Sequence, residues 1–291
     1  MFIGITGASG FVGRSLVELA LQRGHEVIAF TRSPQNQIPG CEMRPFSLTA
    51  PPDLSGCEAI IHLAGESVVG LWTRSKMQRI LNSRVEGTRR IAEAFASMPA
   101  PPEVLVSGSA IGFYGNRLEE ELTEDAPVGT GFLADTTALW EAEALRVKNA
   151  RVVLARTSLV LGKKGGALKA MLPAFRAGLG GPIGNGQQWM SWIHETDQAR
   201  LLLFAAENLE VCGPLNASAP WPVRNEKFTR ELARVLRRPA FFRVPAWALR
   251  PLGEFRHELL DSKRVLPQSA LAHGFGFQFP ELAPALKHLL G

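Results

Sequence analysis

The feature that most constrains this chain is a glycine-rich turn close to its start. A short apolar stretch at residues 2–6 predicts a buried strand, and it continues into Thr-Gly-Ala-Ser-Gly-Phe-Val-Gly at residues 6–13. In such a turn the first glycine permits a tight bend, the second lets the backbone approach a pyrophosphate, and the third lets a helix pack on the sheet. Apolar residues at helical spacing follow as far as residue 23. The pattern predicts a dinucleotide site at the start of that helix.

The alternation of strand-like and helix-like segments continues along the first half of the chain. The further predicted strands are 25–30, 42–46 (the weakest), 59–63, 104–107 and 151–156. The further predicted helices are 75–96 and 136–148. Strands that alternate with helices favour a parallel sheet covered on both faces. We therefore expect an α/β fold with a doubly wound parallel sheet of the Rossmann type.

The sequence pattern changes after residue 160. Glycine-rich loops, tryptophans and proline-bounded helices there predict a smaller and less regular lobe. We expect a dinucleotide-binding domain at residues 1–160 and a mixed substrate lobe at 161–291. Strand-like segments at 191–193 and 215–217 are expected to return to the main sheet from the region 190–220. Residues 240–291 are expected to form a small C-terminal domain.

The end of the second predicted strand indicates which dinucleotide is preferred. A site selective for NAD usually places a carboxylate there, to accept a hydrogen bond from the ribose 2′-hydroxyl. This chain reads Phe-Thr-Arg-Ser at residues 30–33. Arg32 can pair with a 2′-phosphate through two hydrogen bonds, and Thr31 or Ser33 can add another. The residues favour NADP, although Arg32 could also be an ordinary surface arginine.

Charge and composition exclude several classes of function. The formal net charge is +5, with no long run of lysine or arginine, so no nucleic-acid partner is expected. No stretch is long and apolar enough for a membrane span, and the chain opens on a strand rather than a signal peptide. We therefore expect no membrane partner. Three cysteines without metal-ligand spacing favour free thiols in a reducing cytoplasm and no metal site.

Several motifs together resemble a known family. The glycine turn, Leu-Ala-Gly at 63–65, and Val-Ser-Gly-Ser with Tyr-Gly at 106–115 resemble the short-chain dehydrogenase/reductase superfamily, of the extended or atypical type. More narrowly, His-Leu-Ala-Gly-Glu at 62–66, Gly-Gly-Pro-Ile-Gly at 180–184 and Ser-Trp-Ile-His at 191–194 are similar to nucleoside-diphosphate-sugar epimerases, some of them labelled cell-division inhibitors of the SulA type. Arg-Val-Leu-Pro at 264–267 resembles that family's small terminal domain of unknown function.

The resemblance implies a set of cofactor contacts. The pyrophosphate contacts would be Gly7, Ser9, Gly10, Phe11 and Val12. The 2′-phosphate contacts would be Thr31 and Arg32, and the backbone of Leu63 and Ala64 would line the adenine-ribose side. Arg84 stands where extended members keep an asparagine, and its guanidinium could reach a ribose or a phosphate. Leu159 lies in the loop expected to pass the nicotinamide.

The catalytic pattern of the superfamily is incomplete in this chain. The resemblance implies a serine that orients the substrate oxygen, a tyrosine that transfers the proton and a lysine that supports the tyrosine. Ser109 fits the serine, but the stretch 132–141 holds neither tyrosine nor lysine, and the single tyrosine is Tyr114. Tyr114 could act as the acid from a neighbouring loop. Asp135 or Glu141 could replace it, or the protein could bind NADP without turnover.

We therefore predict an NADP-binding oxidoreductase or epimerase-like protein acting on a small carbonyl or sugar-type substrate. The alternative is a non-catalytic NADP-binding sensor or regulator. Long helices on such sheets often pair between two copies of a chain, so the sequence also allows a homodimer. His194 is expected to be a packed histidine and Asp197 a residue at a helix start, rather than catalytic groups.

Overall fold

The computed structural model describes all 291 residues. Its centre is a seven-stranded parallel sheet in the order β11-β7-β5-β4-β1-β2-β3. These strands are β1 (Phe2–Thr6), β2 (Glu26–Thr31), β3 (Cys41–Pro45), β4 (Ala59–His62), β5 (Val104–Ala110), β7 (Arg151–Thr157) and β11 (Gly213–Ala217). The strand order reverses at β1, so a crevice opens beyond the carboxyl ends of β1 and β4, where ligands bind in such sheets.

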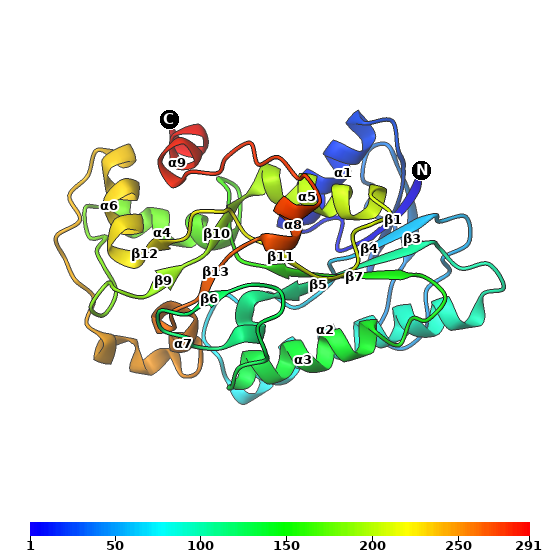
Figure 1. Ribbon diagram of the computed structural model, residues 1–291, viewed down its shortest axis with the longest axis horizontal. Helices are drawn as coiled ribbons and strands as arrows, with labels where there is room; N and C mark the ends of the chain where they lie inside the picture. Colours follow the sequence, from blue (N-terminus) through cyan, green and yellow to red (C-terminus); the bar gives the residue numbers. More distant parts are fainter.

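Helices cover both faces of the sheet, as the alternating sequence predicts (Figure 1). The helices are α1 (Phe11–Gln22) and α5 (Glu195–Glu207) on one face, and α2 (Arg74–Ser97) and α3 (Phe132–Ala144) on the other. Strand residues point alternately to the two faces because the side-chain period of a strand is two. The expected doubly wound α/β fold is confirmed.

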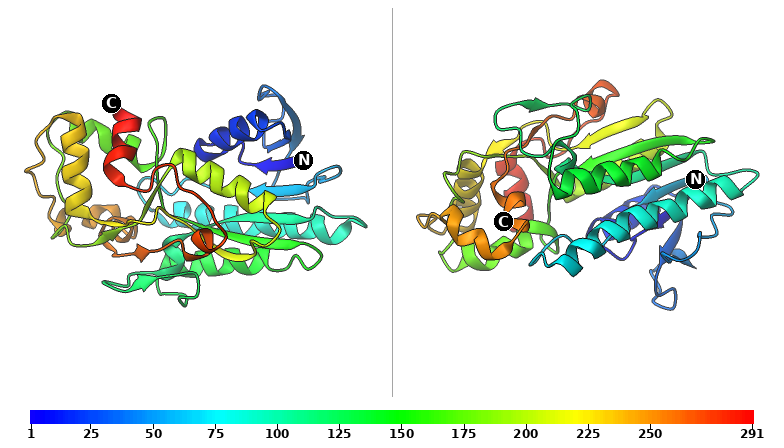
Figure 2. Two further views of the ribbon diagram at one scale, coloured as in Figure 1. Left: turned by 45° about the horizontal axis from the view of Figure 1, so that its top comes forward. Right: turned by 90° about the horizontal axis from the view of Figure 1, so that it is seen from below.

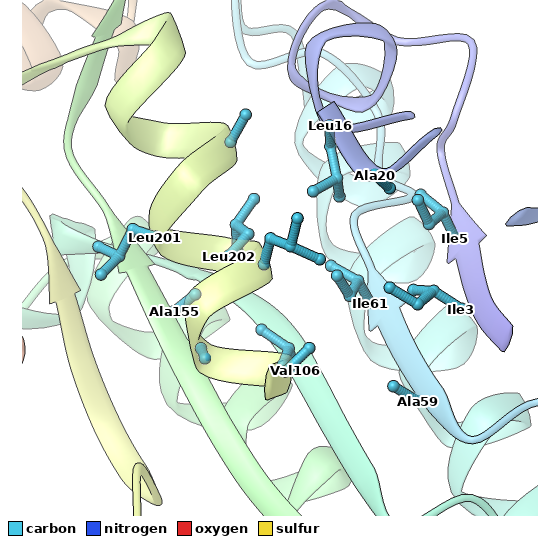
Figure 3. Close-up of a cluster of buried hydrophobic side chains, with 14 of the residues drawn as sticks. Ile3, Ile5, Leu16, Ala20, Ala59, Ile61, Val106, Ala155, Leu201 and Leu202 are labelled. Carbon is cyan, nitrogen blue, oxygen red and sulfur yellow. The ribbon is translucent and has the colours of Figure 1, made fainter. Parts of the chain in front are cut away.

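One face shows how the sequence builds this core. Ile3 and Ile5 of β1 and Ile61 of β4 point toward α1 and α5, where Leu16 and Leu202 meet them (Figure 3). All five side chains are at most 1% exposed. Close packing of buried aliphatic side chains is the main stabilising term in such a layer, at about 25 cal/mol per Å² of apolar area.

A second lobe lies beside the sheet, at the left of both views of Figure 2, and is built largely from residues that follow β7. Its helices are α4 (Gly166–Arg176), α6 (Asn225–Leu236), α7 (Phe255–Leu260) and α9 (Leu282–Leu290), with the 3₁₀ segment η2 (Ala246–Leu252). Its short strand pairs are β8 (Leu159–Leu161) with β10 (Trp192–His194), β9 (Trp189–Met190) with β12 (Val223–Arg224), and β6 (Glu121–Leu122) with β13 (Arg264–Val265). α4, α6 and α9 share one apolar core. The short helix α8 (Gln268–Ala272) instead packs on β11 of the main sheet. No helix of the protein combines the length and the apolarity needed to cross a bilayer.

Two details of the sequence prediction were wrong. Of the two segments expected to return to the main sheet, residues 215–217 do so as part of β11, whereas residues 192–194 pair with β8 in a separate two-stranded sheet. The helix expected at 136–148 begins at Phe132 and ends at Ala144. It begins early because Gly131, with a φ of 105°, turns the chain directly into the first helical residue.

Candidate active site

The glycine turn has the geometry that close approach of a ligand requires. Gly7 adopts a φ of 71°, and a Cβ atom on Gly13 would lie 2.1 Å from the Gly7 carbonyl oxygen, so α1 packs directly on the turn. A Cβ atom on Gly10 would meet one protein atom within 4 Å, the Gly7 oxygen at 3.0 Å, and otherwise points into open space. Gly10 is the N-cap of α1, and no side chain caps the helix there. Its first N–H groups are therefore free to meet an anion.

A cavity of about 280 Å³ lies against this turn and contains seven of the eleven cofactor residues predicted from the sequence. Those seven are Gly7, Ser9, Gly10, Thr31, Arg32, Leu63 and Ala64. They come from the carboxyl ends of three adjacent strands, β1, β2 and β4. The cavity also includes Phe46, Glu66 and Ser83, which the sequence analysis did not select.

Arg32 lines this cavity, and its guanidinium has no carboxylate partner. The residue is exposed and takes part in none of the salt bridges of the molecule, although Thr31 beside it accepts a hydrogen bond from the Ser33 amide at 3.3 Å. An exposed guanidinium without a carboxylate partner can bind a phosphate without first breaking a protein contact.

Thr6 and His62 fix the strand ends that form the cavity wall. The Thr6 hydroxyl accepts hydrogen bonds from the amides of Leu63 at 3.0 Å and Ala64 at 3.1 Å, and lies 2.7 Å from His62 Nδ1. Because this oxygen already accepts hydrogen bonds from two amides, it donates its own hydrogen to Nδ1. Nδ1 is then an acceptor, so the neutral His62 ring carries its hydrogen on Nε2. Complete burial lowers the pKa of His62 to about 4, so the imidazole is neutral. The sequence analysis missed this support, although threonine and histidine at the ends of apolar strands were a usable signal.

The other four predicted cofactor residues lie outside the cavity lining. Arg84 donates to the carbonyl oxygens of Glu66 and Ile80, lies beside Gly65 and has a pKa lowered to about 10 by burial. Phe11 lies against glycines of the loop 162–166, Val12 packs on the core, and Leu159 begins β8, where its amide bonds the Ser191 carbonyl. Of these four, Arg84 presents a charged group near the cavity.

The two predicted catalytic residues belong to one buried hydrogen-bond network. Ser109 donates to Glu141 at 2.5 Å, and Glu141 forms a two-point ion pair with Arg156, with both N–O distances 2.9 Å. Arg156 also donates to the Tyr114 hydroxyl at 3.0 Å, and Tyr114 donates to Asn216 at 2.7 Å. The Tyr114 side chain is fully buried, which raises the pKa of its phenol. Its hydroxyl is therefore held inside the fold by two partners.

A second cavity of about 280 Å³ lies where α3 begins, next to the turn that follows β5. Its lining includes Gly112, Leu133 and Trp72 from the sheet domain and Glu258 and Lys263 from the C-terminal lobe. Lys263 is 6% exposed and its ammonium lies 3.1 Å from Glu258. These groups could not be predicted from the sequence, because nothing in the local sequence of the C-terminal lobe shows that it folds back onto α3.

A sequence model described as the NAD dependent epimerase/dehydratase family matches residues 3–216. The chain belongs to this family. A second family model, for a domain of unknown function designated DUF1731, matches residues 244–289 of this epimerase-family protein. The resemblance inferred from the motifs is thereby confirmed.

Relatives of this epimerase-family protein span nearly its whole length. It is 35% identical to the epimerase family protein YfhF of Bacillus subtilis, over all of this chain and 98% of the relative. It is 36% identical to the human epimerase family protein SDR39U1, over 98% of each chain. The crystal structure of human SDR39U1 with NADPH superposes with a TM-score of 0.93 at 35% identity, covering all of this chain and 99% of the human one. A nucleoside-diphosphate sugar epimerase from Corynebacterium glutamicum superposes at 0.81 and 30% identity, where all of this chain covers 58% of that protein.

His194 is buried and occupies a structural position in this epimerase-family protein. Its Nδ1 accepts the Thr196 amide at 3.0 Å as the N-cap of α5, and its Nε2 lies 3.2 Å from His288 Nδ1. Its ring stacks on Phe279 with centroids 3.9 Å apart. Asp197 is buried in the first turn of α5 and accepts hydrogen bonds from the amides of Gln278 and Phe279. Both residues therefore hold the C-terminal segment on the sheet domain, as the sequence predicts for packed rather than catalytic groups.

We expect the free energy of unfolding to decrease as the pH falls from 7 to 5. Burial lowers the pKa of His62 and His194 to about 4 in the folded state, whereas an unfolded histidine takes up a proton near pH 6.5. The contribution of each neutral ring to the free energy of unfolding is fully present above pH 6.5. It is lost between pH 6.5 and 4, because only the unfolded chain takes up the proton there, and the loss is about 2 kcal/mol per ring at pH 5. Urea unfolding at both pH values measures it. His194→Asn should reduce the slope, and the exposed His257→Asn should not; equal slopes in all three proteins would contradict the assignment.

Proposed function

We propose that this protein binds NADP(H) in the crevice beyond β1, β2 and β4 and acts on a small carbonyl or sugar-type substrate in the second cavity, at the start of α3. The observation that carries the proposal is Arg32, an exposed and unpaired guanidinium on the wall of a cavity built by the glycine turn. The NADPH in the human SDR39U1 crystal supports the same assignment.

The residues present fit the cofactor. The open space in front of Gly10 leaves room for a pyrophosphate at the N–H groups of Phe11 and Val12, beside Gly7 and Ser9. Thr31 and Arg32 would hold the 2′-phosphate, and the Leu63 and Ala64 backbone, fixed by Thr6, would line the adenosine. Arg84 has no carboxylate partner within salt-bridge distance and would direct its remaining N–H groups to a ribose or phosphate oxygen. Leu159 would lie at the nicotinamide end.

Bound NADPH supplies a hydride, and the chain must supply binding, orientation and a proton. The cavity at α3 offers Lys263 and Glu258 as charged groups and a wall formed by Trp72, which is 6% exposed. Phe132 and Leu133 open α3, where the superfamily pattern would place the tyrosine. We propose Ser109 as the residue that orients a substrate oxygen and Tyr114 as the proton donor. Both roles require their present bonds to Glu141, Arg156 and Asn216 to rearrange.

A second candidate function is NADP(H) binding without turnover, as a sensor or regulator. A specific observation favours it: the Tyr114 hydroxyl is buried and hydrogen-bonded to two partners, and burial raises the pKa of the phenol, so the single tyrosine is not poised to donate a proton into the crevice. Binding alone needs the glycine turn and Arg32, and both are intact.

The two functions are separated by measuring binding and turnover on the same preparation. We expect NADPH fluorescence to change on titration with the protein, with NADPH preferred over NADH. With a panel of small carbonyls and sugars, loss of absorbance at 340 nm would support the enzyme, and Ser109→Ala should then lower the rate without weakening NADPH binding. Tight binding with no oxidation across the panel would favour the sensor. Failure to bind NADPH would contradict both.

A further inference from the structure

The net positive charge of this protein is concentrated in one segment. The segment 234–256, from the end of α6 to the start of α7, contains six arginines and one acidic residue, Glu254. The remainder of the chain has 26 basic and 26 acidic residues, so it is formally neutral. The formal charge of +5 is therefore carried by 23 consecutive residues, which we name the basic aromatic edge.

The same segment exposes large aromatic side chains. Phe241 is 86% exposed, Phe242 is 59% exposed and Trp247 is 67% exposed. Leu179, which is 61% exposed, follows Gly178, whose position lies against Pro239 of this segment. Three of the five strongly exposed aromatic side chains of the protein thus fall within seven residues. Figure 1 shows the segment on the outer side of the C-terminal lobe, and both views of Figure 2 keep it there.

The backbone of the segment is fixed, so these side chains are held outward. The Val244 amide bonds the Pro182 carbonyl at 2.8 Å, and the Val244 carbonyl accepts the Gly184 amide at 2.8 Å. A Cβ atom on Gly181 would lie 1.6 Å from the Phe242 carbonyl oxygen, so the two backbones are in direct contact. Leu249 is buried beneath the segment at 8% exposure.

Most of the arginines are exposed and unpaired. Arg237, Arg238 and Arg250 are exposed and form no salt bridge, and Arg243 donates only to the Gly184 carbonyl. One arginine of the edge, Arg234, forms an ion pair, with Glu231 at 3.5 Å. Their charge is available to an external partner because the protein itself does not neutralise it.

We propose that the basic aromatic edge binds the surface of an anionic lipid bilayer. Arginines attract anionic headgroups, while phenylalanine and tryptophan insert at the boundary between headgroups and acyl chains. A single-stranded nucleic acid would instead need a groove with aromatic platforms, whereas Phe241 is 86% exposed. The proposal departs from the expectation drawn from the sequence, which considered membrane-spanning segments, and it is compatible with the absence of a spanning helix.

The test is co-sedimentation of the full-length protein with vesicles of phosphatidylcholine alone or with about one third phosphatidylglycerol. We expect binding to the anionic vesicles, weakened by high salt, and little binding to the neutral ones. Arg237→Glu combined with Arg238→Glu should weaken binding at least about tenfold, since each basic residue near the surface contributes about fivefold. Phe241→Ser combined with Trp247→Ser should weaken it at high salt as well, because insertion is not screened.

Two matched controls make the test specific. Arg74→Glu with Lys148→Glu changes the net charge equally, but these two exposed residues, which form no salt bridge, lie on the sheet domain. Trp221→Ser removes an aromatic side chain that is 63% exposed elsewhere. Both controls should bind like the unaltered protein, and all variants should retain the same thermal unfolding and NADPH binding. The proposal is overturned if anionic vesicles do not bind, if the Arg74 and Lys148 variant loses as much as the edge variant, or if a single-stranded oligonucleotide displaces the protein from the vesicles.

Discussion

Replacing Arg32 with alanine should weaken NADPH binding about 10- to 100-fold and leave NADH binding nearly unchanged. The Arg32 guanidinium is exposed, unpaired and on the wall of the cavity formed by the glycine turn. Hydrogen bonds to a charged group contribute about 1.5–3 kcal/mol when their partner is present. NADH lacks the 2′-phosphate, so it loses nothing when the guanidinium is removed. The expected result is therefore a loss of preference rather than a loss of binding.

The measurement is the dissociation constant for each dinucleotide by fluorescence titration. Arg32→Lys is the conservative variant, and it should recover part of the affinity because it keeps the charge but not the planar pair of donors. Arg74→Ala, at the start of α2, should behave like the unaltered protein, because Arg74 is exposed and forms no salt bridge. If Arg32→Ala binds NADPH as tightly as before, Arg32 is a surface arginine and the preference for NADP lies elsewhere.

Replacing Glu141 with leucine should destabilise the protein by about 3–5 kcal/mol. Glu141 and Arg156 form an ion pair in which the side chains are 7% and 4% exposed. Removing one partner leaves the other charge buried without compensation, which accounts for an effect of this size. Such a loss is a large fraction of the stability of an ordinary domain, about 5–15 kcal/mol.

A double variant shows whether the unpaired charge is the cause. Glu141→Leu combined with Arg156→Met removes both charges from the interior and should recover much of the lost stability in urea unfolding. Tyr114 keeps its hydrogen bond to Asn216 in that variant. A double variant as unstable as the single one would show that the volume and shape of Glu141, not its charge, matter.

The sequence predicted the sheet domain well because local patterns specify it. Four strands, β1, β2, β4 and β5, bury every residue except at their ends, and apolar runs such as Ile60-Ile61 identify them with little ambiguity. The glycine turn and Arg32 could also be predicted, because the role of each depends on one short stretch of sequence. The seven residues gathered in the first cavity lie at strand ends, which parallel strands bring to one edge.

The features that the sequence did not reveal depend on contacts between distant segments. The pairing of β10 with β8 rather than with the main sheet cannot be read from Trp-Ile-His, which is equally apolar in either place. The Ser109, Glu141 and Arg156 network joins three elements separated along the chain, and Lys263 reaches α3 from the C-terminal lobe. For the buried network, the local signal was Arg156, a charged residue near the end of a buried strand.

The ring of Phe11 joins two parts of the molecule that the sequence separates by 150 residues. It is the first residue of α1, and Cβ atoms on Gly162 and Gly165 would lie 2.3 Å and 2.4 Å from it, so the loop before α4 rests on this ring. We expect a ligand that orders the first turn of α1 also to restrict the loop that leads into the second lobe. If a molecule bound in that lobe shifts the loop, the two ligands are coupled, and each changes the affinity for the other by the same factor. Phe11 is the contact through which such coupling between the lobes would pass.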